Sequence, residues 1–211
     1  MDASKRALLP ARIISVIFHP LFMPVYGLAI ILSGYTPFGY MQIPVKNLLF
    51  LIIVVNNVLL PLALLPFLMY MNFISSWTLE EREERVVPLI ITTILYATSS
   101  YILYRFPVPF FLKEFFFSVF LVSLVMTVVN FRWKISLHAV AAGAITGLIL
   151  ILSFRLYSHL FGGLLLVIVA AGLIMSARLK MNLHNPRQVW TGFSAGFVLL
   201  TFFMFFLQQF S

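Results

Sequence analysis

The sequence predicts an all-α protein, a bundle of six or seven helices that cross a membrane. Its 211 residues are 62% hydrophobic and only 9% charged, which is far more apolar than the composition of a soluble domain. The apolar residues also lie in long runs, and about 20 such residues are enough to cross the hydrocarbon core of a bilayer. The runs lie near residues 11–35, 46–73, 88–105, 109–131, 135–154, 160–177 and 189–209.

Two of these runs leave the number of spans open. Pro20 and Pro24 interrupt the first run, which is therefore either a bent span or a re-entrant segment, and the third run is short. The first run is too long for a removed signal peptide and is expected to stay as a span. Asn56 and Asn57 lie in the middle of the second run, where we expect them to bind a neighbouring helix.

The loops between the runs are short, so residues 1–211 read as one integral membrane domain without a soluble module. The longest polar loop covers residues 75–88. In it, Thr78 and Glu81 have the spacing of a capping box, which predicts the start of a short helix. The chain has no cysteine, which excludes disulfides, thiolate metal sites and cysteine nucleophiles.

The net charge of +8 indicates anionic lipid headgroups as partners rather than nucleic acid, because the basic residues are scattered among membrane loops. With seven spans, ten of the 14 lysines and arginines fall on the face that holds the N-terminus. We expect the protein to lie in the inner, cytoplasmic membrane of the cell. The positive-inside rule would then place the face with ten cations on the cytoplasmic side. If half of these cations serve a phosphate, the sidedness stays undecided.

Three polar clusters share this face if the span count is right. They are Arg82 with Arg85; Lys134 with Ser136 and His138; and Arg178 with Lys180, His184 and Gln188. Two histidines among several cations suit phosphoryl transfer, in which one imidazole attacks phosphorus and the other protonates the leaving oxygen. No acidic residue lies in the histidine clusters, so neither a metal site nor another cofactor is expected.

Small residues four positions apart indicate that two of the helices approach closely. They are Ala139, Gly143 and Gly147 in one run and Gly192 and Gly196 in the last. If the two stripes face each other, His138 and His184 come together at the membrane surface. Ordinary packing elsewhere in the bundle is the alternative.

These clusters resemble the motifs of the type 2 phosphatidic acid phosphatase superfamily. In "ARLKMNLHNPRQ", Arg178 and His184 have the spacing of the third signature, Ser-Arg-x5-His-x3-Asp. "ISLH", with Ser136 and His138, resembles the second signature, Pro-Ser-Gly-His. The first signature, Lys-x6-Arg-Pro, is echoed by "REERVVP", which holds Arg82 and Arg85.

The resemblance implies a phosphatase-like core at about residues 75–209, with a lipid phosphate or polyprenyl diphosphate as substrate. It makes His184 the nucleophile and His138 the general acid, and it implies phosphate binding by Ser136, Arg178 and an arginine of the first motif. The sequence departs from the pattern where Gln188 replaces the aspartate that orients the nucleophile. A catalytic phosphatase and a non-catalytic relative that binds or moves anionic lipid, or scaffolds partners, therefore both stay open.

Overall fold

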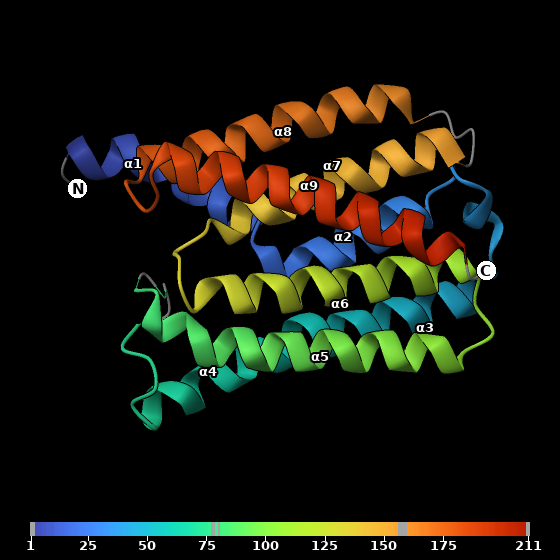
Figure 1. Ribbon diagram of the computed structural model, residues 1–211, viewed down its shortest axis with the longest axis horizontal. Coiled ribbons are helices and arrows are strands. Elements are labelled where there is room, and N and C mark those ends of the chain that lie inside the picture. The colour runs from blue at the N-terminus through green and yellow to red at the C-terminus, as the bar shows by residue number, and fades with distance from the viewer. Residues whose placement is uncertain (1–2, 77–78, 80, 156–159, 210–211) are drawn as a thin grey trace.

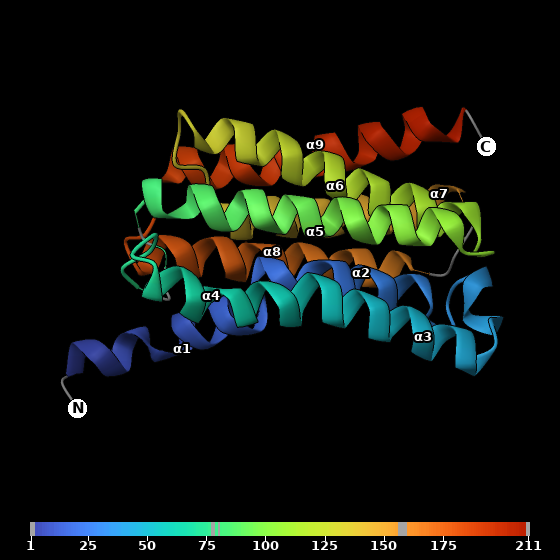
Figure 2. The same cartoon turned by 90° about the horizontal axis from the view of Figure 1, so that it is seen from below.

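A computed structural model describes residues 3–76, 79, 81–155 and 160–209. Within these residues the structure is helical without a strand, and seven stretches are long and apolar enough to cross a membrane. The helices run side by side along the long axis, with the two termini at opposite ends (Figures 1 and 2). The predicted fold class, an all-α multi-pass membrane bundle, is confirmed, and the described chain has seven spans rather than six.

Two of the spans are interrupted within their length. The first consists of α1 (Ala3–Ile17), the 3-10 helix η1 (Pro20–Phe22) and α2 (Met23–Ile31), and the second of α3 (Ile43–Val54), the π-helix η3 (Val55–Leu59) and α4 (Leu60–Tyr70). The other spans are α5 (Val86–Arg105), α6 (Phe110–Asn130), α7 (Leu137–Arg155), α8 (Phe161–Lys180) and α9 (Pro186–Gln208). The 3-10 helix η2 (Pro37–Tyr40) lies in a loop, and η4 (Glu83–Arg85) leads directly into α5. Thr78, the expected helix cap, lies outside the described residues.

Helix α7 is the centre of the bundle, because 67% of its most apolar window is buried, against 28% to 44% in the other spans. It packs most extensively on α9. A Cβ atom at Gly143 would strike the backbone oxygen of Phe193, and one at Gly196 would strike that of Val140. Only glycine allows this approach, so the predicted pairing of the two small-residue stripes is confirmed.

Buried polar groups inside the bundle bind one another across helices. Asn56 Nδ2 donates to Ser99 Oγ at 2.7 Å and to the carbonyl of Leu95 at 2.5 Å, which joins the π-helical turn to α5. This confirms the expected role of Asn56 as a link between helices. Where α7 ends and α6 begins, Arg155 Nη1 lies 3.1 Å from Glu114 Oε2, and its charge neutralises the buried carboxylate.

Candidate functional site

A cavity of about 320 Å³ lies between α2, α4, α5, α6 and α7. Most of its lining is apolar, but one end gathers cationic and imidazole side chains. These are His19, Arg85, His138, Arg178 and His184. Four of the five come from the three polar clusters of the sequence, so the structure brings together residues that lie up to 99 positions apart.

His184 is placed by the tight turn between α8 and α9. Asn182 adopts the left-handed conformation (φ 54°) that ends α8, and Asn185 then caps α9 in a capping box with Gln188. Gln188 Oε1 accepts the backbone N–H of Asn185 at 3.1 Å and lies 3.2 Å from His184 Nδ1. Because this oxygen can only accept, Nδ1 carries the proton, and Nε2 of the neutral ring holds the lone pair.

The environment of His184 keeps its imidazole neutral. Burial is the main cause that lowers its pKa from 6.5 to about 4, and the positive charges of Arg85, Arg178 and Lys134 add to the effect. The hydrogen bond to Gln188 opposes the shift. At neutral pH His184 is therefore a neutral group with a lone pair, the form required of a nucleophile.

The first span holds His138 and Arg178 in position. The backbone N–H of His19 bonds to the carbonyl of Val16 at 3.3 Å, so the break in the span leaves the Ser15 carbonyl outside the α-helical pattern. That carbonyl lies 3.1 Å from Nε2 of His138, and Ser15 Oγ accepts from Arg178 Nη1 at 3.0 Å. A carbonyl only accepts, so Nε2 of His138 carries a proton.

Arg85 enters the cavity from the end of η4, directly before α5. It is only 7% exposed, and its Nε donates to the carbonyl of Leu79 at 2.6 Å. Leu79 has a backbone φ of 47°, a left-handed conformation that is rare for an apolar residue such as leucine. The strained residue thus presents its carbonyl to Arg85 while its own side chain lines the cavity.

Four of the expected site residues do not line the cavity: Gln188, which contacts His184 from outside the lining, and Arg82, Ser136 and Lys134. Arg82 pairs with Glu83 at 2.6 Å and donates to the carbonyl of Phe131 at 2.9 Å, so it links the start of η4 to the end of α6. Ser136 is fully buried, and its hydroxyl has no hydrogen-bond partner among the described residues. Lys134 lies outside the lining, and its positive charge is one of the causes that lower the pKa of His184.

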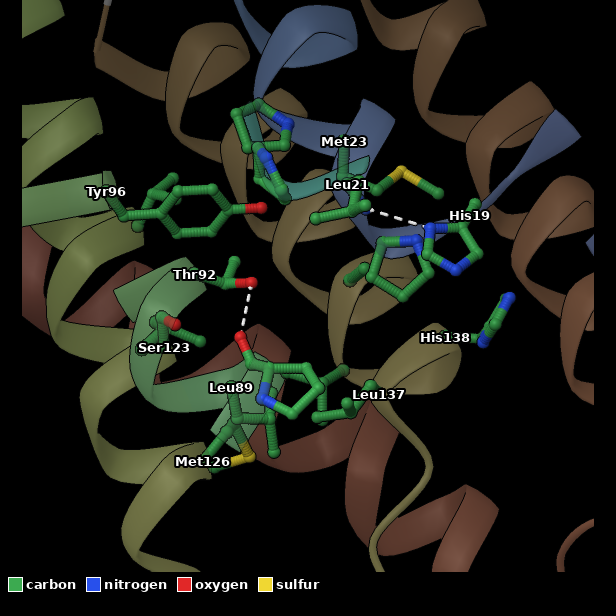
Figure 3. A pocket seen from close by; sticks show the side chains of 18 of the residues that line it. His19, Leu21, Met23, Leu89, Thr92, Tyr96, Ser123, Met126, Leu137 and His138 are labelled. Atoms are coloured by element: carbon green, nitrogen blue, oxygen red, sulfur yellow. Dashed lines mark hydrogen bonds between the residues drawn. The ribbon is translucent and has the colours of Figure 1, made fainter. Parts of the chain in front are cut away.

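Two residues of the first span belong to the site although the sequence did not place them there. Ser15 contacts both His138 and Arg178, and His19 lines the cavity with its ring centroid 5.3 Å from that of His138. Figure 3 shows the two imidazole rings edge to face. The available signal was the position of His19 directly before Pro20, because a proline disfavours the helical conformation in the residue before it, and His19 is indeed extended.

The cavity is suited to an anion. No aspartate or glutamate is found among its described lining residues, whereas two guanidinium groups and three imidazoles share one end. The described residues also contain no group of three histidine, cysteine or acidic side chains placed to hold a metal ion. No family model, no curated protein and no solved structure matches this chain.

Proposed function

We propose that this chain is an integral membrane phosphatase that hydrolyses a lipid phosphate or a polyprenyl diphosphate, with His184 as the nucleophile. The observation that carries the proposal is the meeting of Arg85, His138, Arg178 and His184 at one end of an otherwise apolar cavity. We further propose that the resemblance to the type 2 phosphatidic acid phosphatases reflects kinship, and that the protein resides in the cytoplasmic membrane.

The charged end of the cavity supports a phosphate as the ligand. Arg85 and Arg178 are 7% and 8% exposed, and buried guanidinium groups are stabilised by an anion whose oxygens match their planar fork. In a site of low dielectric constant each such contact is stronger than in water. A phosphate group with two negative charges would offset both cations.

The apolar part of the cavity supports a ligand with a hydrocarbon chain. Its lining on α6 extends from Phe115 to Met126, which is about 16 Å at the rise of an α-helix. The hydrocarbon core of a bilayer is about 30 Å thick, so the cavity reaches through about one leaflet. A lipid can therefore place its phosphate among the cations while its chain stays in apolar surroundings.

The proposed reaction has two steps. Nε2 of His184 attacks phosphorus and forms an N–P bond while the bond from phosphorus to the lipid oxygen breaks. His138 enters this step as an imidazolium: its Nε2–H stays bonded to the Ser15 carbonyl, and its Nδ1–H is given to that oxygen, which leaves as an alcohol or, from a diphosphate, as a lipid monophosphate. Water then attacks the phosphohistidine, His138 takes its proton, and inorganic phosphate is released.

One observation favours a second candidate, a non-catalytic protein that binds or moves anionic lipid. Gln188 gives His184 a neutral hydrogen bond at 3.2 Å, where the resembled signature has a carboxylate. An amide fixes the tautomer but does not stabilise the imidazolium formed during attack. Replacing an acid by an amide in a comparable catalytic relay lowers kcat by about 10⁴.

Phosphate release by the purified protein from a panel of lipid phosphates tests the proposal. We expect turnover that persists in a chelator and is lost in His184→Ala. Arg178→Ala should remove it as well, whereas Arg105→Ala, a cation at the opposite end of α5, should not. Turnover that survives His184→Ala would overturn the mechanism. Binding of lipid phosphate without turnover would establish the non-catalytic candidate instead.

A further inference from the structure

The first span breaks beside the cavity, and His19 sits at the break. It is the N-cap of η1 (Pro20–Phe22), and its Nδ1 accepts the backbone N–H of Leu21 at 3.3 Å. Within a membrane each backbone group released by a helix break needs a new partner, so this bond has a clear structural role. It accounts, however, for only one of the two ring nitrogens.

The cap bond fixes the chemistry of the other nitrogen. Because Nδ1 accepts a hydrogen bond, the proton of the neutral ring must be on Nε2, which makes Nε2 a donor. No hydrogen bond from this nitrogen to another described residue is seen. Figure 3 shows Nδ1 turned to Leu21 and the other edge of the His19 ring turned toward His138.

His19 also lies within reach of the same ligand as His138. The two ring centroids are 5.3 Å apart at an interplanar angle of 85°, and both residues line the cavity. A donor without charge at this place adds a contact to a phosphate oxygen without increasing the repulsion among the cations of the site.

We propose that His19 is a third histidine of the anion site, and that its Nε2–H donates a hydrogen bond to a non-bridging oxygen of the bound phosphate group. The proposal rests on the proposed function, because it assumes that the cavity takes a phosphate. It extends the site to the first span, outside the segment that carries the motif resemblance.

The competing explanation is that His19 only caps η1, and two substitutions separate the possibilities. Asparagine is a good N-cap, so His19→Asn keeps an acceptor for Leu21 but has nothing at the position of Nε2. His19→Gln places an amide N–H near that position and gives a poorer cap. If His19 only caps η1, His19→Asn should keep the affinity for the anion better than His19→Gln does. If His19 binds the ligand, His19→Gln should keep that affinity better.

Orthovanadate is the probe, titrated by calorimetry into the full-length protein in detergent. We expect His19→Asn to keep the melting temperature of the wild type and to weaken vanadate binding on the order of tenfold, the effect of a hydrogen bond to a charged group. His19→Gln should bind vanadate more tightly than His19→Asn. Thr36→Ala is the matched control. Thr36 caps η2, and its hydroxyl oxygen accepts the backbone N–H of Phe38 at 3.2 Å. Thr36 is not one of the residues that line the cavity.

The control should lower the melting temperature and leave the affinity for vanadate unchanged. If wild type and His19→Asn bind vanadate equally well, His19 is only a cap and the inference is overturned while the proposed function stands. If the wild type does not bind vanadate at all, the anion site is wrong and the inference falls with it.

Discussion

Gln188 Oε1 lies 3.2 Å from Nδ1 of His184 and leaves Nε2 of that ring as the atom with the lone pair. The same oxygen completes the capping box of α9 by accepting the N–H of Asn185. One side chain therefore both starts the last span and sets the tautomer of the proposed nucleophile. The fold and the site are coupled at this position.

The lowered pKa of His184 predicts a pH dependence of stability. With a pKa of about 4 in the folded protein and 6.5 in the unfolded chain, the unfolded state binds more protons between these values. The contribution of His184 to stability is complete above pH 6.5 and is lost as the pH falls toward 4, by roughly 3 kcal/mol. The unfolding midpoint of wild type in urea should fall over this range.

His184→Asn is the matched variant for that measurement, because its amide N–H can still donate to Gln188. The difference between the two stability profiles should grow as the pH rises from about 4 to 6.5 and stay constant above it. Parallel profiles would show that His184 is not the group that titrates.

The contact between α7 and α9 predicts a large effect of a single methyl group. In Gly196→Ala the new Cβ would overlap the backbone of Val140, so the helices must separate, at a cost of about 1–3 kcal/mol. Gly172→Ala in α8 is the control, because a Cβ there meets nothing within 4 Å. Thermal unfolding in detergent should show a lower melting temperature for the first variant alone.

Since Gly192 has its Cβ position 2.8 Å from the carbonyl of Ser136, the same interface extends to the loop before His138. Gly196→Ala should therefore also weaken vanadate binding. A variant that loses stability but binds vanadate as well as wild type would separate the glycine contact from the site.

The sequence was sufficient for the membrane fold because apolar length decides it locally, run by run. The sequence also predicted that His138 and His184 lie on the same membrane face, because the number of spans between them determines the face. Span parity does not say which side of a loop turns inward, so Arg85 and Arg82 could not be told apart. No local sequence pattern could predict the contact between Ser15 and Arg178, because these residues are 163 positions apart in the chain.

The apolar depth of the cavity predicts selectivity for chain length. Ala144 lines the cavity on α7, and Ala144→Phe should fill part of the space that a hydrocarbon chain would occupy. Binding of a long-chain lipid phosphate should weaken on the order of tenfold, the loss expected when one or two methylene groups no longer fit. Vanadate, which has no chain, should bind as before.

Ala63→Phe is the matched control for this experiment, because Ala63 is exposed on the outside of α4. It adds the same side chain without entering the cavity and should leave both affinities unchanged. Equal loss of lipid and vanadate binding in Ala144→Phe would indicate a distorted site rather than an occupied chain pocket.

The last prediction concerns the charge beside the nucleophile. Gln188→Glu keeps the length of the side chain, can still close the capping box, and places a carboxylate against Nδ1 of His184. The carboxylate favours the imidazolium that forms during attack, so turnover of a lipid phosphate should rise by roughly tenfold or more. Gln188→Asp is one methylene shorter and should help less. The pKa of His184 should rise in Gln188→Glu, which NMR titration of the ring can measure. An unchanged pKa would show that the 3.2 Å contact does not control His184. A raised pKa with no turnover in either variant would favour the non-catalytic protein.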